Sequence, residues 1–220
     1  MIDLKINKSR LKNHLHYSKW LYVVALIGVL IVFNLAYTMS EPQVPTEFKV
    51  SVLVNNFISD DEGADKLEQE ILAALPEDQQ EVTVFSLAAG GQDMQIMQVL
   101  MARMVAKQDD VLILPYETFV GYAQQSAYLP LEGRVTIPTQ PEGVDMDKYK
   151  VELVDDEGNG NGDPQLYGIP LDGSVGLQSY GLMTQGMVIC VPVTSENQDN
   201  GVRALQYMLD KTTLDEGMQP

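Results

Sequence analysis

The sequence has little of the chemistry on which many enzymes and metalloproteins depend. It contains one cysteine in 220 residues, which excludes an internal disulfide and any site built from several cysteines. Its only histidines, His14 and His16, lie near the start, so residues 48–210 offer none for a catalytic triad or a metal site. Cys190 lies in an apolar stretch, which favours a buried hydrophobic side chain over a reactive thiol. These absences favour a non-catalytic protein.

Basic residues are also scarce. The chain has 14 lysines and arginines against 31 aspartates and glutamates, and its formal net charge is −17. Because phosphate contacts need clustered basic side chains, this balance argues against nucleic-acid binding. Residues 1–19 are the exception, with five basic residues and one acidic residue.

A long apolar run, residues 20–39, follows this basic segment. As a helix it would span roughly 30 Å, the thickness of a membrane's hydrocarbon core. Trp20 and Tyr22 at one end and Tyr37 at the other are typical of the two membrane interfaces. The run therefore predicts a transmembrane helix with its basic side in the cytoplasm. A cleaved signal peptide is the alternative, but the run is longer than usual for one and lacks an A-x-A-like exit.

The domain organisation follows from this pattern and from Pro42 and Pro45, which indicate a stiff spacer. We expect a single-pass protein of the cell membrane, with its N-terminus cytoplasmic and its main domain extracytoplasmic. The predicted parts are a cytoplasmic basic segment 1–19, a transmembrane signal-anchor helix 20–39, a linker 40–47, an extracytoplasmic α/β domain 48–210 and a flexible tail 211–220.

Strand-like and helix-like segments alternate after the spacer. Their alternation predicts an α/β domain with a parallel-type sheet, flanking helices and right-handed crossovers. A Gly-, Pro- and Asp-rich stretch, 132–165, is expected to be irregular apart from an extended piece near 151–154. The other expected strands are 48–54, 82–87, 111–114, 166–170 and 187–193, and the expected helices are 61–75, 93–107, 117–128 and one beginning between 195 and 200.

Several short motifs resemble those of extracellular solute-binding proteins of ABC importers. The resemblance implies one lobe of a periplasmic-binding-protein fold, because no room for the family's second lobe exists between Tyr180 and Met187. One departure is Ala127, where the family usually has glycine. The motifs are KVSVLV at 49–54, DDVLILP at 109–115, ETFVGYAQQSAYLPLEG at 117–133, YGIPLDGS at 167–174 and MVICVPVTSENQDNGVRALQYMLD at 187–210.

Candidate ligand contacts follow from the expected sheet, since open α/β sheets bind ligands beyond the carboxyl ends of their strands. Tyr116 is suited to stack on a sugar or peptide, and three of the other side chains are suited to hydrogen-bond it. The alternative is that turns and helix caps alone explain these residue types. The candidates are Asn56, Gln92, Tyr116, Glu117, Asp172 and Ser174.

Two further patterns raise the question of metal binding, although no cofactor or metal is predicted. Residues 155–163 partly resemble a calcium loop, but the glutamate expected at its twelfth position is Leu166. A flexible turn is the alternative. Thioethers at helical spacing suit Cu(I), yet packing in the core explains them better. They are Met94, Met97, Met101 and Met104.

Taken together, the sequence predicts a membrane-anchored, non-catalytic domain that binds a ligand or partner outside the cell. A small solute, such as a sugar or peptide, and a membrane protein are the candidate partners, and no nucleic acid is expected. A structural or assembly role beside another membrane or envelope protein is the alternative, and an exposed apolar patch would favour it. An acid-based hydrolase would need two carboxylates facing each other across a cleft.

Overall fold

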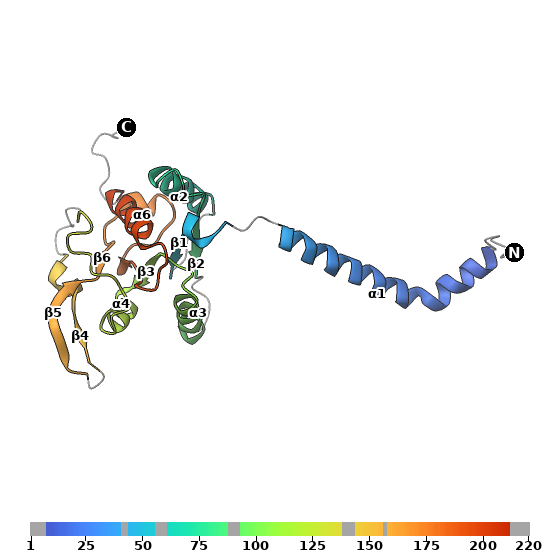
Figure 1. Ribbon diagram of the computed structural model, residues 1–220, viewed down its shortest axis with the longest axis horizontal. Helices are drawn as coiled ribbons and strands as arrows, with labels where there is room; N and C mark the ends of the chain where they lie inside the picture. Colours follow the sequence, from blue (N-terminus) through green and yellow to red (C-terminus); the bar gives the residue numbers. More distant parts are fainter. Residues whose placement is uncertain are drawn as a thin grey trace. The chain divides into compact units, whose positions relative to one another are not determined.

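Figure 1 shows the computed structural model of the protein, which describes residues 8–40, 44–55, 61–87, 93–137, 144–155 and 158–211. The chain divides into two compact units, Met1–Gln43 and Val44–Pro220. The first contains one helix, α1 (Lys8–Ser40). Among the residues described, no helix combines the length and the apolar character needed to cross a membrane. The structure therefore lends no support to the predicted transmembrane helix 20–39.

The second unit is an α/β domain, as predicted, built on a five-stranded sheet. β1 pairs in parallel with β2 on one side and with β3 on the other, as the alternation of strands and helices predicts. The sheet order is β2-β1-β3-β7-β6, with bounds β1 Lys49–Val54, β2 Glu81–Ser86, β3 Val111–Pro115, β6 Gly168–Pro170 and β7 Met187–Cys190.

The predicted parallel-type sheet is wrong for β7. This strand pairs antiparallel with both β3 and β6, so the sheet is mixed. Residues 171–186, which join β6 to β7, contain only the one-turn helix α5 (Val175–Gln178). A parallel connection usually runs through a crossover helix, and the single turn of α5 does not provide one, so the chain turns back beside β6.

Helices cover both faces of the sheet (Figure 1). α2 (Asp61–Ala74) and α6 (Gln198–Asp210) pack on the face that carries Val50, Val52 and Val54. On the opposite face, which carries Leu53, Leu112 and Leu114, lie α3 (Asp93–Val105) and α4 (Tyr116–Ala123). Alternate side chains of the central strands thus face two separate apolar clusters.

The stretch 132–165 is more regular than predicted. It contains the short helix η2 (Met146–Tyr149) and a hairpin of β4 (Lys150–Val154) and β5 (Gly160–Leu166). The expected extended piece near 151–154 is therefore one strand of an antiparallel pair. Another short helix, η1 (Thr46–Phe48), precedes β1.

A close aromatic contact fixes α4 against the sheet. Phe119 is fully buried and stacks on Tyr128, with 5.4 Å between ring centroids and 11° between ring planes. Gly168 in β6 leaves room for this ring: a β-carbon there would lie 2.6 Å from Phe119 Cε2 and 2.5 Å from Val188 Cγ1. The site described next begins at α4, so this packing positions it.

Candidate functional site

Two of the predicted contact residues meet at one edge of the sheet. Because β7 is antiparallel to both β3 and β6, the carboxyl ends of β3 and β6 lie at the edge where β7 begins. The backbone N–H of Tyr116, just after β3, donates to the Gly186 carbonyl at 3.0 Å. The Gly186 N–H in turn donates to Asp172 Oδ1 at 2.8 Å. Gly186 thus joins the loops that carry Tyr116 and Asp172.

A second aromatic residue, Tyr149 of η2, completes this group. Its ring packs edge-on to Tyr116, with 5.3 Å between centroids and 77° between planes. The Tyr116 hydroxyl donates to the Lys148 carbonyl at 3.0 Å. Asp145 begins η2 by accepting a hydrogen bond from the Asp147 N–H. We call Tyr116, Tyr149 and Asp172 the strand-end cluster.

The electrostatics of the strand-end cluster keep Tyr149 neutral. Burial raises the pKa of its phenol, and the negative charge of Asp172 and the proximity of Tyr116 raise it further. Tyr149 is therefore a hydroxyl donor at physiological pH. Tyr116 remains 37% exposed. The cluster thus offers an accessible aromatic ring beside a carboxylate, which suits a ligand with both a flat apolar face and hydroxyl or amide groups.

The other predicted contacts do not join this group. Glu117 is exposed in the first turn of α4. Ser174 is buried, 1% exposed, and within the described structure its hydroxyl has no hydrogen-bond partner, so it does not form part of an accessible rim. Asn56 and Gln92 lie outside the described residues.

Sequence reasoning missed Tyr149. It follows a stretch without strand or helix periodicity, and nothing in its neighbours ties it to the end of β3. The one local signal is the Asp at position 145, a residue type that favours helix starts. That signal locates η2 but gives no indication of which strand it packs beside.

A carboxylate pair lies at the opposite edge of the sheet, just before β3. Arg103 binds Asp109 through two hydrogen bonds, Nε to Oδ2 at 3.0 Å and Nη2 to Oδ1 at 2.6 Å. Asp110 accepts from Ser195 Oγ at 2.6 Å and from the Ser51 N–H at 2.9 Å. Both carboxylates are buried and are held by donors that join β1, α3 and the loop before α6. Such contacts serve the fold, whereas the hydrolase hypothesis requires acids that face substrate.

The Asp110 carboxyl makes stability depend on pH. Burial raises its pKa from 3.8 to about 6, although hydrogen bonds from Ser195 and Ser51 oppose the shift. The folded state therefore binds the carboxyl proton of Asp110 more tightly than the unfolded state does. The free energy of unfolding that this proton contributes is lost as the pH rises through 6. We expect the domain to be about 1 kcal/mol more stable at pH 5 than at pH 7 through this group. Urea unfolding at both pH values measures it, and Asp110→Asn should remove the difference; an unchanged difference in that variant would contradict the assignment.

The calcium-like stretch 155–163 begins directly after β4 and includes the first residues of β5. The Asn159 N–H donates to Asp155 Oδ1 at 2.8 Å, and the Gly158 N–H donates to the Asp155 carbonyl at 2.9 Å. Residues 156 and 157 lie outside the described part. Across the described residues, no group of three or more His, Cys, Asp or Glu side chains is placed to hold a metal ion. The turn interpretation accounts for the contacts of Asp155.

The prediction that the methionines of α3 pack in the core is wrong for two of them. Met97 is 38% exposed and Met101 is 51% exposed, whereas Met104 is partly buried against the core. The side chain of Met94 lies outside the described part. Cys190, in contrast, is fully buried as predicted, and burial raises the pKa of its thiol.

Comparisons with known proteins give distant similarities. No protein-family model matches the chain, and no curated protein matches it. Solved structures that resemble it include an extracellular solute-binding protein family 1 member from Alicyclobacillus acidocaldarius, with 19% identity and a TM-score of 0.35 over 60% of this chain and 28% of that one. An ABC substrate-binding protein from Listeria monocytogenes in complex with cycloalternan has 17% identity and a TM-score of 0.35 over 55% of this chain and 28% of that one.

A third similar structure is a spermidine/putrescine ABC transporter substrate-binding protein from Streptococcus pneumoniae. It has 10% identity and a TM-score of 0.42, and the match covers 73% of this chain and 77% of that one. These proteins are of the class that the sequence motifs resemble. The chain spans only 28% of the length of the first two. At such TM-scores and identities, none of the similarities decides what this chain does.

Proposed function

We propose that the chain is a non-catalytic binding domain that takes a small solute, such as a sugar or a peptide, at the strand-end cluster. The observation that carries the proposal is the grouping of Tyr116, Tyr149 and Asp172 at the edge where ligands bind in open α/β sheets. The ring of Tyr116 is available for stacking, and among the described residues only Oδ1 of the Asp172 carboxylate accepts a hydrogen bond, from Gly186. A non-catalytic role also fits the absence of histidine from residues 48–210.

The proposal places this domain outside the cell membrane, anchored by residues 20–39 with the N-terminus in the cytoplasm. The basic segment before the apolar run supports this orientation. Residues 20–33 are all apolar apart from one glycine. A helix that is apolar on all sides suits an apolar environment better than water.

A thermal-unfolding screen of the full chain in mild detergent tests the proposal. Neutral oligosaccharides and tripeptides are the probes, and a binding probe should raise the melting temperature. The double variant Tyr116→Ala/Asp172→Asn should weaken binding by at least about tenfold, because it removes both a stacking surface and a charged acceptor. Asp199→Asn, at an exposed carboxylate of α6, is the matched control and should bind normally.

Two results would count against the proposal. One is a panel in which no probe shifts the wild-type transition, and the other is an equal shift in the double variant. Intact mass of the same preparation tests the anchor: the expected mass includes residues 1–39, and an N-terminus near Ser40 would show a cleaved signal peptide instead.

A structural or assembly role is the second candidate, and one observation favours it. Helix α3 presents large apolar side chains to solvent, with Met97, Met101 and Val105 on one side of the helix and Val99 on another. An exposed apolar face of this kind is typical of protein contacts.

A further inference from the structure

Three methionines of α3 bring their thioether groups to the same side of the helix. The chain has 11 methionines, and four of them fall within residues 94–104. Met97, Met101 and Met104 follow each other at intervals of four and three residues, so they lie within about 60° of one another around the helix axis. Met97 is 38% exposed and Met101 is 51% exposed, so packing in the core does not account for these two side chains.

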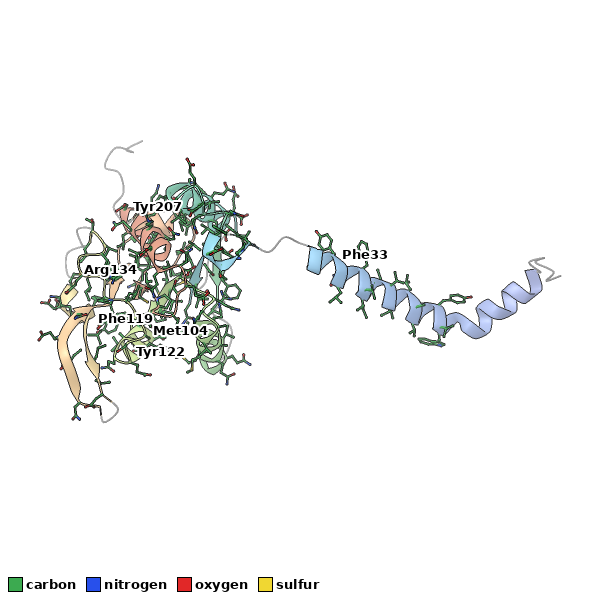
Figure 2. All side chains as sticks on the ribbon, viewed as in Figure 1. Phe33, Met104, Phe119, Tyr122, Arg134 and Tyr207 are labelled. Atoms are coloured by element: carbon green, nitrogen blue, oxygen red, sulfur yellow. The ribbon has the colours of Figure 1, made fainter. Side chains whose placement is uncertain are left out.

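A hollow of about 200 Å³ lies beside these thioethers. Its lining residues are Met101, Met104, Val105, Tyr122 and Thr194. Figure 2 shows Met104 and Tyr122 close together on this side of the domain. The Tyr122 hydroxyl donates to Met97 Sδ at 3.1 Å, which holds a third sulfur beside the hollow. Three thioethers from one helix thus lie around a single space, next to an aromatic ring.

The hydrogen bond from Tyr122 orients Met97 and leaves its sulfur able to bind a metal ion. A thioether sulfur has two lone pairs, and one hydrogen bond uses only one of them. The sulfur is also a weak acceptor, so little free energy is lost if a metal ion weakens this bond. Burial raises the pKa of the Tyr122 phenol, so the phenol remains a donor and does not become an anionic ligand.

The electrostatics of the hollow select against hard metal ions. In the described structure, no charged side chain lines it. Arg103 of α3 is paired with Asp109. Lys107, just beyond the helix, is paired with Glu196 at 3.1 Å. Ca²⁺ and Mg²⁺ need several oxygen ligands, whereas neutral thioethers suit a soft monovalent ion. The net charge of −17 attracts cations to the protein as a whole.

We propose that Met97, Met101 and Met104 bind one Cu(I) ion at this hollow through their three sulfur atoms. Thioethers are among the ligands that select Cu(I) over harder metal ions. The Cα atoms of Met97 and Met104 are about 10 Å apart along the helix, and the long, flexible side chains can converge across that distance. The site uses no residue of the strand-end cluster, so it does not depend on solute binding there.

Competition for Cu(I) with the chelator bicinchoninate tests the proposal, on the full chain in mild detergent, without oxygen and with ascorbate present. His14→Asn and His16→Asn are included in every protein compared, because imidazoles also bind copper. Cys190 is buried and burial raises the pKa of its thiol, so it does not compete for the ion. The parent protein should withdraw one Cu(I) ion per chain from the chelator.

Leucine substitutions remove the sulfur atoms and nearly conserve the side-chain volume. The triple variant Met97→Leu/Met101→Leu/Met104→Leu should bind Cu(I) at least about tenfold more weakly, because even the residues that only orient metal ligands have effects of this size. Met183→Leu, at a methionine that is 54% exposed elsewhere in the domain, is the matched control and should bind as the parent does. Circular dichroism verifies the fold. Met101→Leu alone, at an exposed position, should also weaken binding and does not disturb the core.

The pH dependence of binding identifies the type of ligand. Thioethers carry no proton to lose, whereas imidazole and thiol ligands must lose one before they bind a metal ion. After correction for the protonation of the chelator, the Cu(I) affinity should therefore be equal at about pH 6 and about pH 8. X-ray absorption of the loaded protein should show sulfur as the scattering ligand.

Three outcomes would overturn the proposal. The first is a parent protein that takes no Cu(I) from the chelator beyond a detergent blank. The second is a triple leucine variant, or a Met101→Leu variant, that binds Cu(I) as tightly as Met183→Leu. The third is an affinity that falls as the pH is lowered, which would assign the ion to nitrogen or thiol ligands elsewhere in the chain.

Discussion

Replacing Arg103 with methionine is expected to destabilise the domain by about 3–5 kcal/mol, because it leaves the Asp109 carboxylate buried without its charged partner. The Asp109 side chain is 1% exposed, so a methionine in place of Arg103 leaves its carboxylate largely shielded from water. In the variant, the Ser51 hydroxyl would still donate a hydrogen bond to Asp109 Oδ1, at 3.1 Å in the wild type. The Arg103 guanidinium also packs over the Phe85 ring, with 4.3 Å from its carbon to the ring centroid. Guanidinium chloride unfolding at pH 7 measures the loss.

A double variant separates the loss of charge pairing from the loss of packing. Arg103→Met combined with Asp109→Asn removes both charges, so it should be more stable than Arg103→Met alone by at least about 1 kcal/mol. If the single variant loses less than about 1 kcal/mol, or if Asp109→Asn fails to rescue it, the ion pair does not have the role assigned here.

Phe119→Ala is expected to destabilise the domain by about 3–5 kcal/mol, because it removes a fully buried ring and leaves a cavity. The stacking on Tyr128 is lost with it. Denaturant unfolding gives the magnitude. Val120→Ala, at a partly buried residue on the same helix, is the matched control and should cost less.

The cavity can be detected through Gly168. In the wild type, Gly168→Ala places a methyl group against Phe119 and Val188 and should cost about 1–3 kcal/mol. In the Phe119→Ala background part of that crowding is gone, so the same substitution should cost less. Equal costs in both backgrounds would show that Phe119 does not close the space beside β6.

The parts of the fold that depend on local pattern could be predicted from the sequence. Val111 to Leu114 are apolar without alternation, and the structure places β3 in the middle of the sheet with both faces covered. The spacing of apolar residues near the carboxyl end of the chain predicts α6. Leu205, Met208 and Leu209 are buried as expected, and Val202 is partly buried.

Features that depend on tertiary structure could not be predicted in the same way. An apolar run such as β7 indicates burial on both sides, but burial carries no information about strand direction. α4 ends at Ala123, five residues earlier than expected, because Ser126 takes a left-handed conformation (φ 60°) and Tyr128 pairs with Pro192. The methionine spacing of α3 fits a buried helix as well as an exposed one, and only the exposed fractions of Met97 and Met101, which depend on tertiary packing, distinguish the two.

In the candidate site, too, some positions follow from local sequence pattern and others depend on tertiary structure. Strand ends are predictable wherever the strands are, so the positions of Tyr116 and Asp172 at one edge could be predicted. Tyr149 comes to that edge through η2, and its position depends on how the hairpin that follows folds back. Glu117 lies on the surface because it faces away in the first turn of α4.

The position of β7 also determines when the sheet can be completed during synthesis. β3 and β6 are not direct neighbours, and only residues 187–190 bridge them. A nascent chain that has emerged no further than β6 therefore holds β3 with one hydrogen-bonding edge open, and an open edge invites pairing with other chains. The centre of the sheet can form only after β7 has been synthesised. Folding of the domain therefore depends on contacts between distant parts of the chain.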